Sequence, residues 1–211
     1  MAVPAEGARN TNAGDAAGSR ARILDAAERL IGARGYAGAS ISMIARESGL
    51  PPSSIYWFFG SKEDLLAAVV ERGVASWLAA QASWAETARD LRGLIESGVA
   101  TALAHPDFLR VLFMLTLEGR TGSSKAGGAL RAAWRGVEAR LEAIMTKHYG
   151  LSGHPDGPAI ATRLARFALA HFDGLFLDSQ VDPDSTRPGD LADDLACALD
   201  ALAAAAGARP A

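Results

Sequence analysis

The sequence predicts an all-α protein of about nine helices, in which a small three-helix N-terminal domain precedes a larger C-terminal helical domain. Apolar residues recur at spacings of three and four along most of the chain, and clusters of Gly and Pro separate these stretches. With 211 residues, 49% hydrophobic and 21% charged, the chain can bury a substantial core and divide into a small and a larger domain.

Composition and periodicity also set the expected domain limits. Residues 1–18 are rich in Ala, Gly and Asn without periodicity, so we expect a disordered leader there. We assign residues 19–65 to the first domain, 66–206 to the second and 207–211 to a tail.

The second and third helices of the first domain are separated by a tight turn. Ser40 can cap a helix with inward apolar residues at spacings of three and four, and Gly49 suits its left-handed end. Pro51 restricts the residue before it to an extended conformation, and Pro52 can serve as the first residue of the next helix. These residues predict two short helices joined by a fixed turn, the arrangement of a helix-turn-helix.

The third helix is unusual for its serines and aromatics. Ile55 and Phe59, four residues apart, are expected to pack inward, with Tyr56 near the boundary. The outward face would carry Ser53, Ser54, Trp57 and Phe58. Gly60 ends the helix, and Ser61 with Asp64 three residues later has the layout of a capping box that opens a fourth helix. Hydroxyls and aromatic edges on an exposed short helix are typical of a reader of a DNA groove.

Residues over some fifty positions fit one known family. They are Ile23-Leu24-Asp25-Ala26-Ala27, Gly35-Tyr36, Ser40, Ile44-Ala45, Gly49, Ile55-Tyr56, Phe59 and Gly60-Ser61-Lys62-Glu63-Asp64-Leu65-Leu66. In these residues the segment from Arg20 to about Arg72 resembles the DNA-binding domain of the TetR (tetracycline-repressor-like) family of transcriptional regulators. The resemblance covers the first third of the chain. It departs from the family at Pro51, where a capping Ser or Thr is usual, at Ser53, where Gly is frequent, and at Phe58, where His is common.

The resemblance implies a ligand-responsive repressor that binds a near-palindromic site on double-stranded DNA as a homodimer. Tyr56 can donate its hydroxyl to a phosphate and Trp57 can cover a thymine methyl, although both could also be packing aromatics. Lys62 stands at a helix start, where it can clamp a phosphate. Residues 1–62 carry a net charge of +2 and the remainder −5, which favours DNA binding at the first domain. The expected DNA-binding residues are Arg22, Ser40, Ser53, Ser54, Tyr56, Trp57 and Lys62.

Six further helices are expected after the turn at Gly60. The first, residues 61–84, has a broad apolar stripe and is long enough to link the DNA-binding part to the rest. The others are expected at residues 88–104, 106–118, 125–149, 158–180 and 189–206.

The last two helices are predicted to form a dimer interface. The helix at 158–180 is apolar on two sides, and such a helix is usually covered once by its own domain and once by a partner. Two helices from each subunit would then build a four-helix bundle, although both could merely fill a monomer core. The interface residues expected are Phe172, Phe176, Leu195, Leu199 and Leu202.

The middle of the chain is rich in aromatics and methionine at helical spacing. Such residues are often plain core, but proteins of the resembled family bind an inducer among these helices, which implies an apolar small-molecule effector. The ligand-binding residues expected are Trp77, Phe108, Phe113, Met114, Leu117, Trp134, Phe167 and His171.

Other functions find little support in the sequence. It contains no G-x-S-x-G, no H-E-x-x-H and no glycine-rich phosphate loop, and its four histidines lack ligand-like spacing, so we expect neither an enzyme nor a metal or cofactor. A single cysteine and the lack of a membrane-length apolar stretch fit a cytoplasmic protein. The alternative hypothesis is a helical interaction protein that has lost DNA binding. Pro51 and Pro52 in the turn are the features that support this alternative.

Overall fold

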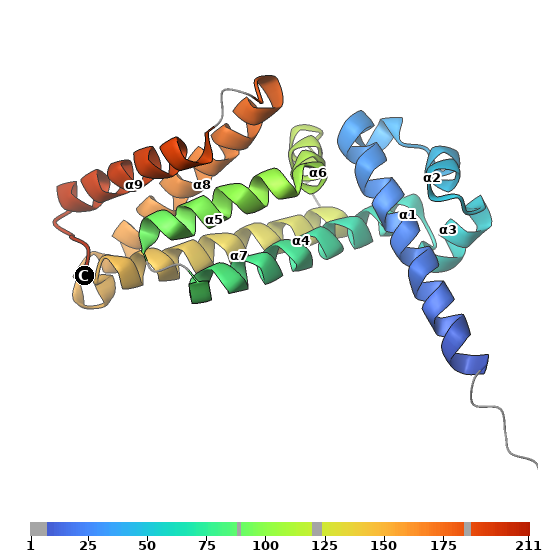
Figure 1. The fold of residues 1–211 in the computed structure, drawn as a ribbon, viewed down its shortest axis with the longest axis horizontal. Helices are drawn as coiled ribbons and strands as arrows, with labels where there is room; N and C mark the ends of the chain where they lie inside the picture. Colours follow the sequence, from blue (N-terminus) through green and yellow to red (C-terminus); the bar gives the residue numbers. More distant parts are fainter. Residues whose placement is uncertain (1–7, 88–89, 120–123, 184–186) are drawn as a thin grey trace, which may run out of the picture. The chain divides into compact units, whose positions relative to one another are not determined.

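The computed structural model describes residues 8–87, 90–119, 124–183 and 187–211 (Figure 1). The described residues contain nine α-helices, one short 3-10 helix and no strand, which confirms the predicted all-α class. The α-helices are α1 (Ala8–Gly38), α2 (Ile41–Ser48), α3 (Pro52–Phe59), α4 (Lys62–Thr87), α5 (Leu91–Ala104), α6 (Pro106–Leu117), α7 (Lys125–His148), α8 (Gly157–Val181) and α9 (Pro188–Ala205), and the 3-10 helix spans Leu151–Gly153.

The chain forms two compact units that interleave along the sequence. The first combines the chain up to Val74 with Asp107–Arg131, and the second combines Ala75–Pro106 with Ala132–Ala211. Helices α4 and α7 therefore contribute one part to each unit. This division differs from the boundary after residue 65 expected from sequence, because Val69 of α4 and Val111 of α6 are fully buried in the same core as α1 to α3.

Helix α1 begins earlier than the expected end of the leader. It runs back to Ala8, so the described part of residues 1–18 is helical rather than without structure, and residues 1–7 lie outside the described residues. No proline interrupts the stretch, and its alanines have high helix propensity, which allows the backbone to continue as a helix. Near its other end α1 is broken at Gly35, whose φ of 72° is in the left-handed region.

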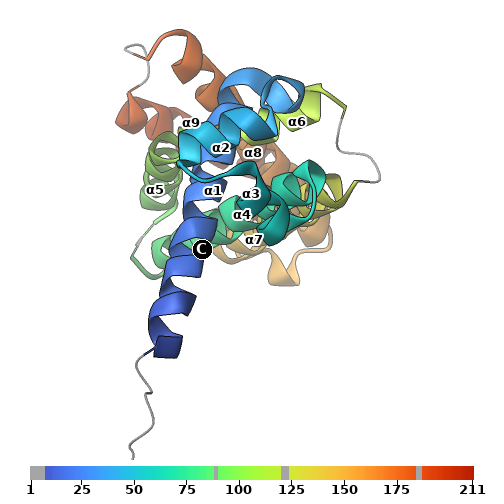
Figure 2. The same ribbon diagram turned by 90° about the vertical axis from the view of Figure 1, so that its right-hand side faces the viewer.

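The first unit is built around one core shared by α1, α2, α3, α6 and the starts of α4 and α7. Figure 2 looks onto this unit and shows the short helices α2 and α3 beside the long α1. The largest fully buried side chains of the unit belong to Ile23, Leu24, Ile31, Ile44, Ile55, Leu65, Leu66 and Leu115. This core holds α3 from behind by Ile55 and Phe59, as the spacing of those two residues predicts.

Helix α6 packs closely on α1 and α4 within the first unit. A Cβ atom added at Gly73 of α4 would lie 2.0 Å from Phe108 Cδ2, so the ring of Phe108 occupies the space that any side chain there would need. At the other end of α6, the carboxylate of Glu118 accepts the backbone N–H of Tyr36 at 3.3 Å. Helix α6 is thereby fixed to the helices that carry α2 and α3.

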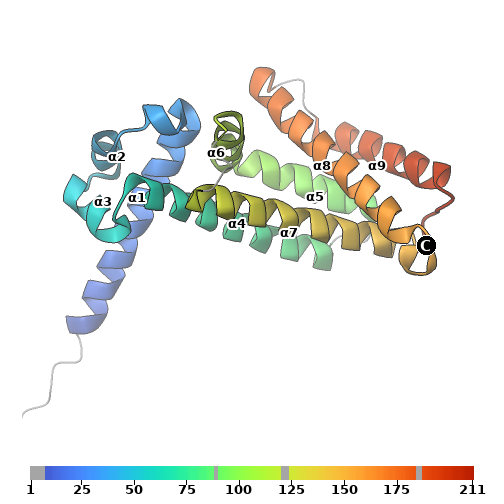
Figure 3. The same ribbon diagram turned by 180° about the vertical axis from the view of Figure 1, so that it is seen from behind.

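The second unit is a layer of helices around its own apolar core. Helices α5, α8 and α9 lie side by side, as Figures 1 and 3 show. The hydroxyl of Tyr149 donates to Asp200 Oδ1 at 2.9 Å, and burial together with this bond raises the pKa of Tyr149, so its hydroxyl stays protonated at neutral pH. Within the described residues, no individual helix combines the length and apolar content needed to cross a membrane.

Candidate nucleic-acid interface and apolar pocket

Helix α3 leaves two large aromatic side chains in solvent. Trp57 is 75% exposed and Tyr56 is 53% exposed, while Ile55 and Phe59 on the opposite face are buried. Ser53 is exposed and Ser54 is half-buried. The sequence predicts Tyr56 near the boundary and Phe58 facing outward, but Phe58 is half-buried against the core and Tyr56 takes the outward position. The exposed residues of α3 are therefore Pro52, Ser53, Tyr56 and Trp57.

The two ends of the turn between α2 and α3 have the expected geometry. Gly49 follows α2 in the left-handed conformation, with φ of 67° and ψ of 26°, and Pro52 is the first residue of α3. Pro51 makes no side-chain cap bond, so only its carbonyl takes part, accepting the N–H of Ser54 at 3.0 Å. The turn is held by backbone geometry rather than by a capping hydroxyl.

The start of α2 presents two hydroxyls. Ser40 Oγ accepts the N–H of Met43 at 3.2 Å, which is the predicted cap, and lies 3.1 Å from Ser42 Oγ. Ser42 is exposed and was missed by sequence analysis. The signal was a second serine two residues after a capping serine, next to the unpaired N–H groups of a helix start that attract anions.

Two basic residues expected at DNA have partners within the protein. Arg22 Nη2 donates to the carbonyl of Ser48 at 2.6 Å and so satisfies a carbonyl at the end of α2. Lys62 Nζ donates to the carbonyl of Tyr36 and lies 4.1 Å from the centroid of the Tyr36 ring. Both cations therefore stabilise the turns around α2, although each still adds positive charge to this unit.

The start of α4 is fixed directly after α3. Ser61 Oγ accepts the N–H of Asp64 at 3.0 Å and donates to Asp64 Oδ2 at 2.6 Å, and Lys125 of α7 also pairs with this carboxylate. The Lys125 ammonium and the Ser61 hydroxyl hold the pKa of Asp64 below its usual value. The capping box predicted from sequence thus anchors the chain where α3 ends.

The eight expected ligand-binding residues are divided between the two units. In the first unit Phe108 is buried against Gly73, Met114 borders Gly35, and Leu117 is 80% exposed. In the second unit Trp134 and Phe167 are exposed by 40% and 39%. The helical spacing of these residues predicts apolar stripes. On α6, several residues of such a stripe pack against the rest of the first unit. Phe113 is half-buried in the first unit, and Trp77 and His171 are half-buried in the second.

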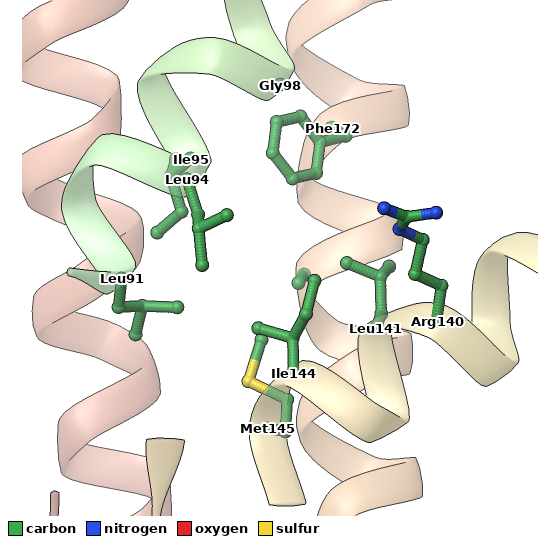
Figure 4. A pocket seen from close by; sticks show the side chains of 10 residues that line it. Leu91, Leu94, Ile95, Gly98, Arg140, Leu141, Ile144, Met145 and Phe172 are labelled. Atoms are coloured by element: carbon green, nitrogen blue, oxygen red, sulfur yellow. The ribbon is translucent and has the colours of Figure 1, made fainter. Parts of the chain in front are cut away.

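An apolar pocket does exist within the second unit, and none of the eight residues lines it. It lies among α5, α7 and α8 and has a cavity volume of about 50 Å³ (Figure 4). Its lining consists of Leu91, Leu94, Ile95, Gly98, Arg140, Leu141, Ile144, Met145, Ala168 and Phe172. Arg140 is the one charged residue in this lining, and Phe172, which sequence analysis assigned to a dimer interface, faces the pocket.

Two polar groups of the second unit are buried without a hydrogen-bond partner among the described residues. Trp77 Nε1 and His171 Nε2 are shielded from solvent and have no hydrogen-bond partner there. Burial raises the pKa of Asp173 to about 6. Buried polar groups of this kind cost stability unless a hydrogen-bond partner satisfies them. Hydrogen-bonding atoms in the interior of this unit therefore remain available to a partner.

Most of the expected dimer residues face inward. Phe176, Leu195 and Leu199 are 4%, 1% and 0% exposed, and Leu202 packs against the same core. Their side chains therefore fill the interior of one protomer. The apolar stripes of α8 and α9 that the sequence predicts to form the dimer interface are the stripes that pack within their own unit. The opposite face of α8 is exposed and carries Phe167, Ala170, Gly174, Leu177 and Val181.

Among the described residues, no three His, Cys, Asp or Glu side chains gather closely enough to hold a metal ion. The described residues thus offer several features for binding, among them the exposed face of α3, the exposed face of α8 and the apolar pocket.

Comparison with known proteins connects the segment that carries α2 and α3 to one family. The model of bacterial regulatory proteins of the tetR family matches residues 23–69, which include α2, α3 and the start of α4. The HTH-type transcriptional repressor SCO4008 of Streptomyces coelicolor is 34% identical over 104 residues, covering 49% of this chain and 53% of that protein. The match spans about half or less of the length of the first curated relatives.

Solved structures extend the likeness over most of the chain. A TetR-family regulator from Agrobacterium tumefaciens aligns with a TM-score of 0.69 at 20% identity, covering 85% of this chain and 96% of that one. The regulator FadR of Bacillus subtilis, solved with stearoyl-CoA, aligns with a TM-score of 0.66 at 16% identity over 86% and 96% of the two chains. At these identities the alignments establish a shared fold. Residues 23–69 therefore form a helix-turn-helix segment of the kind found in the tetR family of bacterial regulatory proteins, and the chain shares its fold with the TetR-family regulator from Agrobacterium tumefaciens.

Proposed function

We propose that this protein is a repressor that binds double-stranded DNA as a homodimer, with α3 in the major groove, and that an apolar effector releases it. The observation that carries the proposal is the exposure of Trp57 and Tyr56 side by side on α3. Two large aromatic side chains in water are unfavourable unless a partner covers them. A short helix behind a fixed turn is the geometry that places such side chains in a groove.

The chemistry of α3 suggests how the DNA is read. Its sequence, PSSIYWFF, contains no Arg, Lys, Asn or Gln, so it has none of the side chains that form paired hydrogen bonds to a base edge. Trp57 can cover a thymine methyl, and the hydroxyls of Ser53 and Tyr56 can reach phosphates or base edges. Hydroxyls and N–H groups at the start of α2, from Ser40 and Ser42, would bind a neighbouring phosphate.

A homodimer would present two copies of α3 to successive turns of DNA, about 34 Å apart. The exposed stripe of α8, from Phe167 to Val181, supports this assembly because it is apolar and includes Ala170 and Gly174, which permit close helix approach. Exposed small residues on α9, at Cys197, Ala201 and Ala204, would lie beside it. If a two-fold axis related these faces, α8 and α9 of the two protomers would form a four-helix bundle.

The proposed release of DNA by an effector is supported by the apolar pocket and by the ligands bound to proteins of the same fold. The apolar pocket lies among α5, α7 and α8, and α7 also enters the first unit through Lys125 and Leu130. A regulator of the same fold was solved with stearoyl-CoA, and a protein from Saccharomonospora viridis with choline, so the fold accommodates small molecules. A hundredfold loss of DNA affinity needs only about 2.7 kcal/mol of differential binding.

The test of DNA binding starts by selecting duplexes from a random pool with the purified protein. We expect one sequence to be enriched and expect Trp57→Ala to weaken its binding about tenfold in fluorescence anisotropy, since a lost base contact costs about 1 to 3 kcal/mol. Trp134→Ala is the matched control, because Trp134 is also exposed but lies outside α3. Enrichment of no duplex, or equal binding by both variants, would instead favour an interaction protein that has lost DNA binding.

The dimer is tested by placing a charge on the proposed interface. We expect Leu177→Glu to sediment as a monomer at micromolar concentration while the unchanged protein sediments as a dimer. Leu117→Glu is the control, since Leu117 on α6 is even more exposed, at 80% against 48%, but lies off the α8 face. A dimer that persists in Leu177→Glu, or a monomeric unchanged protein, contradicts this assembly.

A further inference from the structure

We infer that Lys62 is a positioning residue: it holds the end of α3 in place through Tyr36, and its ammonium does not bind a DNA phosphate. The sequence predicts a different role, a phosphate clamp at the start of α4. The part of the inference that concerns DNA rests on the proposed function, whereas the part that concerns α3 does not. Three observations support it: the two contacts of the ammonium, the short connection from α3 to Lys62, and the contact of Tyr36 with α6.

The ammonium of Lys62 is directed toward the end of α1. Its Nζ donates to the carbonyl oxygen of Tyr36 at 2.5 Å and lies 4.1 Å from the centroid of the Tyr36 ring. Tyr36 is in the last turn of α1, where carbonyl groups lack partners within the helix and attract a cation. Both residues are half-buried, so the two contacts hold the ammonium against the protein rather than extended into solvent, where a phosphate would lie.

Lys62 restrains α3 because the two are close in the chain. Phe59 is the last residue of α3, and Lys62 is the first residue of α4. Only Gly60 and Ser61 lie between them. Gly60 has φ of 75°, and Ser61 accepts the N–H of Asp64 as the cap of α4. A connection this short leaves the end of α3 little freedom once Lys62 is attached to α1.

Tyr36 is itself held by α6. Its N–H donates to the carboxylate of Glu118 at 3.3 Å, while its carbonyl accepts from Lys62. Gly35 beside it allows α6 to approach closely, since an added Cβ would lie 2.5 Å from Glu118 Oε1 and 3.1 Å from Met114 Cε. Charged groups of α4 and α6 thus contact the two sides of one residue, all within the first unit. The end of α3 is therefore positioned by a junction of α1, α4 and α6.

Amide hydrogen exchange of the full-length protein, followed by mass spectrometry, tests the positioning of α3 without DNA. Lys62→Met keeps most of the apolar stem but removes the charge. We expect the amides of residues 54–59 to exchange about tenfold faster in this variant, the factor expected when a hydrogen bond to a charged group is lost. Exchange in residues 23–31 of α1 should stay the same, which distinguishes a local loosening of α3 from a loss of global stability. Arg29→Met is the control, because Arg29 bonds α1 to Glu47 of α2 in an exposed ion pair and should leave α3 unaffected.

The salt dependence of DNA binding tests whether Lys62 contacts a phosphate. A residue that neutralises one phosphate contributes about 0.9 to the slope of log affinity against log salt concentration. With the selected duplex, we expect Lys62→Met to weaken binding by the same factor at every salt concentration, so that the slope is unchanged. Tyr36→Leu keeps the charge of Lys62 but removes the ring beside it, and it should also weaken binding without changing the slope. Tyr36→Phe keeps the ring and should bind as the unchanged protein does.

The two measurements separate this inference from the proposed function. Three results would each overturn the inference: a slope lowered by about 0.9 in Lys62→Met, unaltered DNA affinity in that variant, or exchange in α3 as slow as in the unchanged protein. If the unchanged protein selects no duplex, the proposed function fails, and hydrogen exchange alone decides the role of Lys62. Faster exchange in α3 of Lys62→Met would then still support positioning through Tyr36.

Discussion

Replacing Gly73 with alanine should destabilise the first unit, although alanine is the better helix former. The added Cβ would lie 2.0, 2.2 and 2.8 Å from Phe108 Cδ2, Cε2 and Cγ, whereas carbon atoms in contact prefer about 3.5 to 4.0 Å. Phe108 is only 3% exposed, so its ring cannot move away without leaving the interior. Helix propensity would contribute about 1 kcal/mol in favour of alanine, and overpacking would cost about 1 to 3 kcal/mol.

The expected net loss is up to about 2 kcal/mol, or up to about 8 °C in the unfolding midpoint for a chain of this size. Circular dichroism at one fixed protein concentration measures it. Gly136→Ala is the control: Gly136 lies inside α7 with nothing within 4 Å of an added Cβ, so this change should raise the midpoint. Phe108→Leu added to Gly73→Ala should recover part of the loss. If Gly73→Ala raised the midpoint as Gly136→Ala does, the packing argument would be refuted.

Two further predictions concern stability. Ser61→Ala removes the acceptor of the Asp64 N–H and should cost about 1 kcal/mol in urea unfolding, and no loss would show that the cap contributes nothing. Asp173→Asn should stabilise the protein near pH 7 but not near pH 4. Burial raises the pKa of Asp173 to about 6, above its unfolded value, so the folded state binds more protons between about pH 4 and 6 and loses stability as pH rises through that window. Equal differences between variant and unchanged protein at pH 4 and pH 7 would contradict this assignment.

Much of the first unit could be predicted from sequence because its signals are local. Gly49, Pro52 and Ser61 each restrict the backbone within a few residues, and the structure places a left-handed turn, a helix start and a cap at those positions. The spacing of Ile55 and Phe59 likewise identifies the buried face of α3. Such features need no knowledge of distant contacts.

The pocket and the outer face of α8 could not be predicted from the sequence, because both are determined by contacts between distant helices that residue spacing does not reveal. A helix with two apolar stripes does not reveal which stripe its own unit covers, and Leu195 and Leu199 were therefore assigned to the wrong side. The pocket needs three helices from separate parts of the chain, and its one cation, Arg140, resembles any surface arginine in the sequence. Partners of Arg22 and Lys62 were also hidden, because each contacts a residue 26 positions away.

The interleaving of the two units limits how this gene could exchange parts with its relatives. A crossover after residue 65 would separate α1 to α3 from Val69, Val111 and Leu115, which close the same core. A hybrid would need α6 and the neighbouring portions of α4 and α7 from the same parent as the helix-turn-helix. Recombination that keeps these segments from one parent needs two crossovers in addition to the first. We therefore expect viable hybrids of such proteins to inherit these discontinuous segments together.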